Sequence, residues 1–199
     1  MNLNELRDRA YLCAVSHGWH NENLSNEHFL CLVISELMEA MEADRKGRHA
    51  DTKKFNQKMD YYIHEMKLYG ENYDKAYRDT FEYYLKDSVE DELSDACIRL
   101  LDLAGLRNIN LSSVSFPISN SEGHIESRRK LSFTEWCYDV ASLIARYNKD
   151  CFPKGFLFVG ILQEMCCIAE IIGFDILWHI EQKIKYNELR PYKHGGLVY

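Results

Sequence analysis

Apolar side chains recur at helical spacing along most of this chain, and residues that interrupt helices are scarce. Only ten glycines and three prolines are spread through 199 residues. A helix presents one apolar stripe when its hydrophobic residues return every three or four positions. No stretch shows the strict alternation of apolar and polar residues that is typical of a half-buried strand. The pattern therefore predicts an all-α fold.

Capping residues, glycines and prolines set the limits of the expected helices. We expect a single all-α domain over residues 1–199, with a four-helix-bundle-like core and additional helices. Residues 44–75 are polar and are interpreted as an insertion with one short helix. Residues 105–131 contain a proline, two glycines and six serines and are interpreted as a flexible loop. The expected helices are at about 3–18, 25–47, 55–68, 74–105, 133–148, 154–172 and 175–189.

Charge and cysteine usage restrict the partners and the compartment. The net charge of −7 argues against binding to nucleic acid, which needs a basic surface. The seven cysteines form no Cys-x-x-Cys motif and lie mostly among apolar residues, as expected of reduced thiols. Charged residues near the start argue against a signal peptide. No stretch approaches the roughly 18 apolar residues of a membrane span. We therefore expect a cytoplasmic protein without membrane contact.

Two acidic pairs are the main candidates for chemistry. Glu36 and Glu39 are three residues apart in one expected helix, and Glu92 and Asp95 are three apart in another. Side chains at this spacing are neighbours on a helix surface. Two such helices facing each other would form a cage of carboxylate oxygens, which suits Mg²⁺ or Mn²⁺. The alternative is that both pairs are solvated acidic faces.

A second set of candidates could bind a phosphorylated ligand. Lys183, Asn187 and Arg190 fall on one helical face near the C-terminus, where Lys and Arg could donate to phosphates. The alternative is that the basic residues complement a helix C-terminus.

Three segments together resemble the MazG-like, all-α nucleoside triphosphate pyrophosphatases, a superfamily that includes the dimeric dUTPases and the dCTP pyrophosphatases. The family pattern is Glu-Glu-x-x-Glu followed by Glu-x-x-Asp and a later basic helix. Ser35 stands where that pattern has its first glutamate. The matching segments are Ile34–Ala40, Glu90–Gly105 and Lys183-x-x-x-Asn187-x-x-Arg190.

The resemblance implies an activity and its machinery. Members hydrolyse a nucleoside triphosphate to the monophosphate and pyrophosphate with Mg²⁺ or Mn²⁺ as cofactor. Glu36, Glu39, Glu92 and Asp95 would be the metal-binding and catalytic residues. Lys183, Asn187 and Arg190 would bind the substrate. Trp19 is a further candidate, which could stack on the nucleobase; the alternative is that Trp19 is a hydrophobic anchor at a helix end. The resemblance also implies a homo-dimer or tetramer.

Two other classes of protein compete with this interpretation. A di-iron carboxylate protein needs Glu-x-x-His on two helices, and no glutamate in this chain is followed three residues later by histidine. A non-catalytic helical sensor of nucleotide or metal, or a protein-interaction module, stays open as the alternative to an enzyme.

Overall fold

The computed structural model describes residues 2–69, 72–147 and 154–195 of the chain. In this part the protein is helical apart from turns and one isolated bridge between Asn2 and Ser115, so the predicted all-α class is confirmed. The helices are α1 (Leu3–Ser16), α2 (Asn26–Arg45), α3 (Thr52–Tyr69), α4 (Tyr73–Tyr84), α5 (Val89–Leu106), α6 (Glu122–Arg129), α7 (Phe133–Ala145), α8 (Lys154–Ile172) and α9 (Ile176–Glu188), followed by the short 3-10 turn Tyr192–Gly195.

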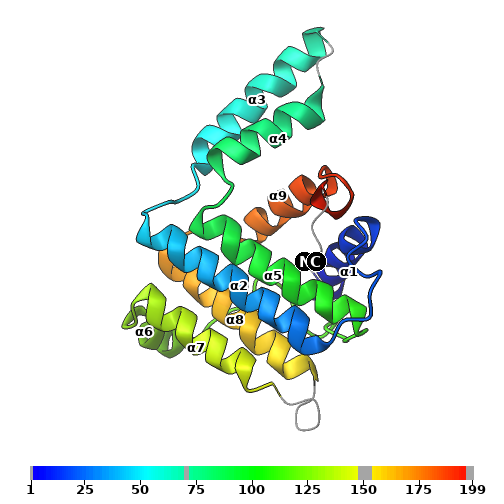
Figure 1. Ribbon diagram of the computed structural model, residues 1–199. Coiled ribbons are helices and arrows are strands. Elements are labelled where there is room, and N and C mark those ends of the chain that lie inside the picture. Colours follow the sequence, from blue (N-terminus) through cyan, green and yellow to red (C-terminus); the bar gives the residue numbers. More distant parts are fainter. Residues whose placement is uncertain (1, 70–71, 148–153, 196–199) are drawn as a thin grey trace.

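Helix α5 lies at the centre of the main body. It packs against α1, α2, α8 and α9, and α2 runs beside it over much of its length (Figure 1). Its apolar residues are almost completely buried, among them Leu93, Ala96, Leu100 and Leu101. Because a core helix must exclude water on most sides, the polar residues of α5 are also forced into contact with neighbouring helices. This is what positions the acidic side chains described below.

Helices α3 and α4 form a hairpin that projects from the body (Figure 1). The hairpin has a small hydrophobic cluster of its own, which includes Phe55, Tyr77 and Phe81. Tyr186 of α9 completes this cluster by stacking on Phe81, with 4.4 Å between the ring centroids. The segment 44–75 that was predicted as an insertion therefore contributes α3 and the start of α4, and the hairpin is anchored to the body through α9.

The single helix expected over 74–105 was wrong. The chain leaves the hairpin at the end of α4 and enters the body at the start of α5. Between them Asp87 adopts a φ of 57°, a left-handed conformation that stops a helix. Ser88 then caps α5 by accepting a hydrogen bond from the backbone N–H of Asp91. One left-handed residue and one capping serine do not change the spacing of apolar residues, so the apolar pattern could not predict this break.

The loop expected over 105–131 was wrong in part, because helix α6 lies within it. Ser121 caps α6, whose described residues include none that is buried, so the apolar pattern could not reveal it. Polar contacts hold it instead: the guanidinium of Arg128 donates to Glu164 at 2.7 Å and to Asp139 at 3.0 Å.

Helix α8 has the bounds expected from Pro153 and Gly173. By length and composition its window Gly155–Ile172 could cross a membrane, contrary to the expectation that no stretch comes close. However, 56% of that window is buried against the other helices, which is also the property of a central core helix. The described cysteines are free thiols, as expected of a reduced set, and Cys151 lies outside the described residues.

Candidate metal centre

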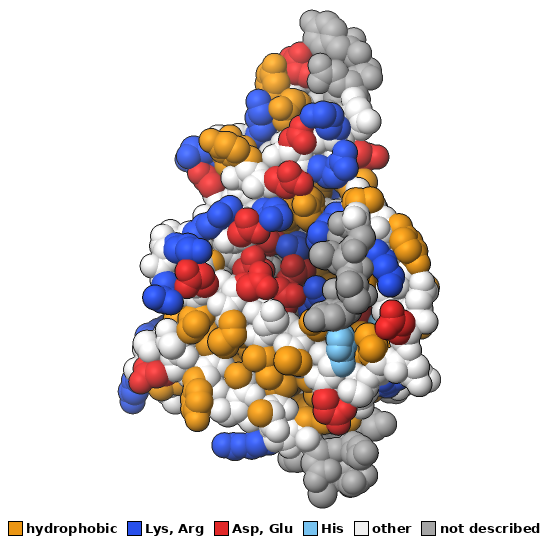
Figure 2. Space-filling view, viewed as in Figure 1, with side chains coloured by type: hydrophobic (Ala, Val, Ile, Leu, Met, Phe, Trp, Pro, Cys, Tyr) orange, Lys and Arg blue, Asp and Glu red, His pale blue; other side chains and the backbone are white. Residues whose placement is uncertain are grey.

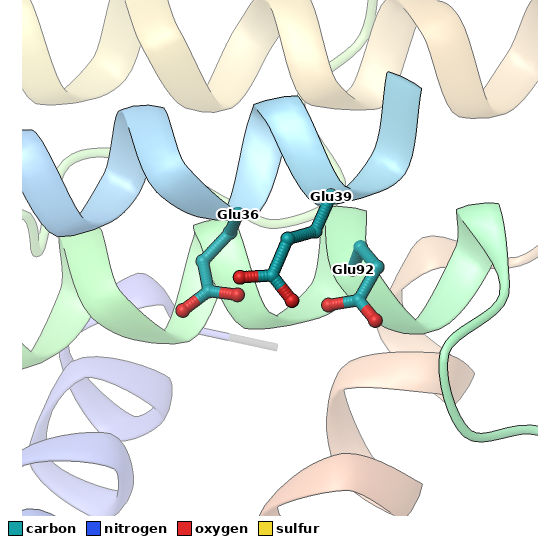
Figure 3. A group of neighbouring side chains, drawn as sticks. All are labelled: Glu36, Glu39 and Glu92. Atoms are coloured by element: carbon teal, nitrogen blue, oxygen red, sulfur yellow. The ribbon is translucent and has the colours of Figure 1, made fainter. Parts of the chain in front are cut away.

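The predicted metal-binding glutamates meet where α2 and α5 run side by side. Glu36 and Glu39 are on one side of α2, and Glu92 is in the first turn of α5. One carboxylate oxygen from each residue lies within 4.8 Å of the others. Figure 3 shows the three side chains pointing in the same direction from the two helices. We call Glu36, Glu39 and Glu92 the glutamate triad.

The triad combines two buried carboxyl groups with an exposed one. Glu36 and Glu92 are buried, whereas Glu39 is exposed. Burial, reinforced by the nearby Asp91 and Asp95, raises the pKa of Glu92 to about 9. Burial and Asp95 likewise raise the pKa of Glu36 to about 7, although Arg99 opposes the shift. Burial thus makes the ionised forms of Glu36 and Glu92 costly, and a cation bound between them would reduce that cost.

Asp95, the fourth predicted ligand, faces a different partner. Its carboxylate accepts from the ammonium of Lys183 at 2.8 Å, and Asp91 contacts the same ammonium at 2.8 Å. Lys183 is buried, with 4% of the residue exposed. Lys183 therefore neutralises two carboxylates of α5, and its predicted contact with a phosphate would compete with them. The role of Asp91 was missed, although its spacing of four residues from Asp95 places both on one helical face.

A hollow of about 550 Å³, counting its open mouth, adjoins Asp95. Only about 60 Å³ of this is space that water molecules could fill, well below the roughly 300–1,000 Å³ of a small-molecule pocket, so a nucleotide would occupy mostly the open mouth. Three of the predicted substrate-binding residues line it: Trp19, Asn187 and Arg190. The side-chain oxygen of Asn187 is buried and has no hydrogen-bond partner among the described residues, although most buried polar groups have one. A ligand with an N–H or O–H group could supply the missing donor.

Arg99, which was not predicted as a site residue, contacts the triad and also lines the hollow. Its Nε donates to Oε1 of Glu36 at 3.0 Å, and its side chain also lines the hollow. Asp91, Asp95, Arg99 and Asp102 recur at intervals of four, four and three residues, so they form one polar stripe along α5. This stripe is visible in the sequence. The pairing with Glu36 is not, because it depends on how α2 packs against α5.

Acidic side chains gather on the face of the molecule below the projecting hairpin, with basic side chains around them (Figure 2). Ser35, at the position of the first glutamate in the MazG-like pattern, donates a long hydrogen bond of 3.5 Å to Glu39.

In comparisons with known proteins, no family model, no curated protein and no solved structure matches this chain. The functional interpretation therefore depends on the site itself and on the motif resemblance.

Proposed function

We propose that this protein is a Mg²⁺-dependent nucleoside triphosphate pyrophosphohydrolase of the MazG-like type, which converts an NTP or dNTP and water to the monophosphate and pyrophosphate. The observation that carries the proposal is the meeting of Glu36, Glu39 and Glu92 at one point, next to a hollow lined by Asn187 and Arg190. The order of these motifs along the chain supports the same function.

The triad suits a small divalent cation. All three ligands are carboxylate oxygens, which Mg²⁺ and Mn²⁺ prefer to nitrogen or sulfur. Burial first, and neighbouring carboxylates second, raise the pKa of Glu36 and Glu92, so a cation bound between them would favour their ionised forms. Glu36, Glu39 and Glu92 would hold the ion, and Asp95 would join them if its contact with Lys183 were exchanged. When bound, Mg²⁺ would neutralise phosphate oxygens and favour ionisation of a coordinated water.

The protein residues around the hollow would place the substrate. Arg190 would donate to phosphate oxygens, since Lys183 is already engaged by Asp91 and Asp95. Asn187 would accept a hydrogen bond from the nucleoside, and Trp19 would contact the base or sugar. A carboxylate at the edge of the triad would orient the attacking water in line with the bond between the α- and β-phosphates.

The test is pyrophosphate release from a panel of ribo- and deoxyribonucleoside triphosphates with Mg²⁺ or Mn²⁺. Glu39→Gln should lower the rate by a factor on the order of 100 or more, because it removes a ligand charge without disturbing a buried residue. Glu42→Gln is the matched control: it lies one turn further along α2, is 46% exposed and pairs with Arg45. The control should retain wild-type activity.

The same assay separates an enzyme from a sensor. A non-catalytic binding protein could also contain this acidic cluster, because Lys183 and Arg99 already neutralise part of its negative charge. If the wild type and Glu39→Gln bind nucleotides with equal affinity and neither releases pyrophosphate, the proposal of catalysis fails. We also propose a homo-dimer or tetramer, and light scattering that gives a monomer mass at micromolar concentration would contradict this.

A further inference from the structure

Arg99 occupies a position between the triad and the hollow. It lies on α5 one turn after Asp95, and its Nε is 3.0 Å from Oε1 of Glu36. The side chain of Glu36 is only 9% exposed, but that of Arg99 is 34% exposed. Since Arg99 also lines the hollow, its guanidinium can reach either the carboxylate or a ligand by changing rotamers of a long side chain.

A cation bound by the triad would compete with Arg99 for Glu36. Both are positive, and two positive charges held a few ångströms apart repel each other. A divalent ion carries a larger charge than the guanidinium, and Glu36 would share it with Glu39 and Glu92. The guanidinium, once displaced, remains beside a hollow that contains Arg190 and Asn187.

We propose that Arg99 is an exchangeable counter-ion, which pairs with Glu36 in the metal-free site and turns into the hollow when a divalent cation binds, where it donates to acceptor oxygens of the nucleotide. This deepens the proposed function, on which it rests. The planar guanidinium suits this role because it can donate two parallel hydrogen bonds to a pair of acceptors.

The exchange couples two binding events in opposite ways. Without nucleotide, Arg99 weakens cation binding because it occupies a ligand of the triad. With the cation bound, the same side chain strengthens nucleotide binding. Removing the guanidinium should therefore improve the first and impair the second, whereas a residue that only supports the fold would impair both.

The experiment measures two dissociation constants for wild type, Arg99→Gln and Arg99→Lys. Isothermal titration with Mn²⁺ in the absence of nucleotide should show binding to Arg99→Gln that is tighter on the order of tenfold. Titration with α,β-imido nucleoside triphosphates of the common bases at saturating Mn²⁺ should show binding weaker on the order of tenfold. Arg99→Lys keeps the charge but cannot donate two parallel hydrogen bonds. Its nucleotide affinity should therefore fall, while its Mn²⁺ affinity stays near that of the wild type.

Arg45→Gln is the matched control for charge. Arg45 is exposed at the end of α2 and pairs with Glu42, so neither constant should change. A wild type that binds no Mn²⁺ would refute the proposed function itself. A wild type that binds Mn²⁺ no more weakly than Arg99→Gln, with native circular dichroism in both, would refute only the exchange.

Inorganic tripolyphosphate identifies the acceptors. Equal losses of affinity for tripolyphosphate and for the nucleotide analogues in Arg99→Gln would place the acceptors on the phosphates, and a loss for the analogues alone would place them on the nucleoside. No loss for either probe would overturn the proposed contact.

Discussion

Replacing Glu92 with glutamine should make the metal-free protein less sensitive to alkaline pH. Burial beside Asp91 and Asp95 raises the pKa of Glu92 from its ordinary value of 4.5 to about 9. The folded protein therefore keeps a proton that the unfolded chain loses, so stability is fully present below pH 4.5 and is lost as pH rises towards 9. Each pH unit within this window costs up to about 1.4 kcal/mol.

Between pH 5 and pH 8 this loss amounts to about 4 kcal/mol for Glu92 alone, as an upper limit. Glutamine has nearly the same shape and does not titrate, so Glu92→Gln should remove that part of the slope. Glu36 remains and continues to contribute, because its pKa is also raised, to about 7. The variant should thus lose clearly less stability than the wild type over the same pH range.

The assay is urea unfolding in EDTA at several pH values from 5 to 8, followed by circular dichroism. The same series with excess Mn²⁺ should stabilise the wild type at pH 8 far more than the variant, which lacks a ligand. Glu42→Gln, at an exposed position, should follow the wild type throughout. Identical pH slopes for wild type and Glu92→Gln in EDTA would refute the reasoning that Glu92 is strained by its neighbours.

Three further substitutions test separate parts of the structure. Lys183→Met should lower the free energy of unfolding by about 3–5 kcal/mol at pH 8, since it leaves Asp91 and Asp95 without their buried cation, and urea unfolding at unchanged stability would contradict this. Phe81→Ala should cost about 3–5 kcal/mol and accelerate hydrogen exchange in α3 and α4, whereas equal protection of the hairpin before and after would argue against its separate cluster. Asn187→Ala should weaken nucleotide binding on the order of tenfold and leave Mn²⁺ affinity unchanged by calorimetry; a loss of Mn²⁺ affinity instead would place Asn187 at the metal.

The parts of the fold that could be predicted are those in which a local pattern and a local boundary agree. Helix α8 is the clearest case, since Pro153 precedes its first residue and Gly173 follows its last. The break before α5 was missed because it depends on the left-handed backbone conformation of Asp87. Aspartate adopts this conformation more readily than most residues, but its presence in a sequence does not predict it. Helix α6 was missed because it buries no residue and therefore shows no apolar stripe.

The candidate site also has a part that the sequence could predict and a part that it could not. The spacing of Glu36 and Glu39 puts them on one side of a helix, and the meeting of this pair with Glu92 was predicted. The contacts that modify the site were not predicted, because they join residues far apart in the chain. Arg99 reaches Glu36 across 63 positions, and Lys183 reaches Asp91 across 92. Only the packing of α2 and α9 against α5 brings them together.

Helix α9 links the hairpin to the acidic face of α5. Lys183 contacts Asp91 and Asp95, and Tyr186, three residues later, stacks on Phe81 of the hairpin. A force that bends the hairpin would pull on Tyr186 and so displace the ammonium that balances those carboxylates. The charge available to a ligand at the triad is then sensitive to a segment that contributes none of its members. A protein bound to the hairpin could in this way change the charge at the triad without contacting any of its members.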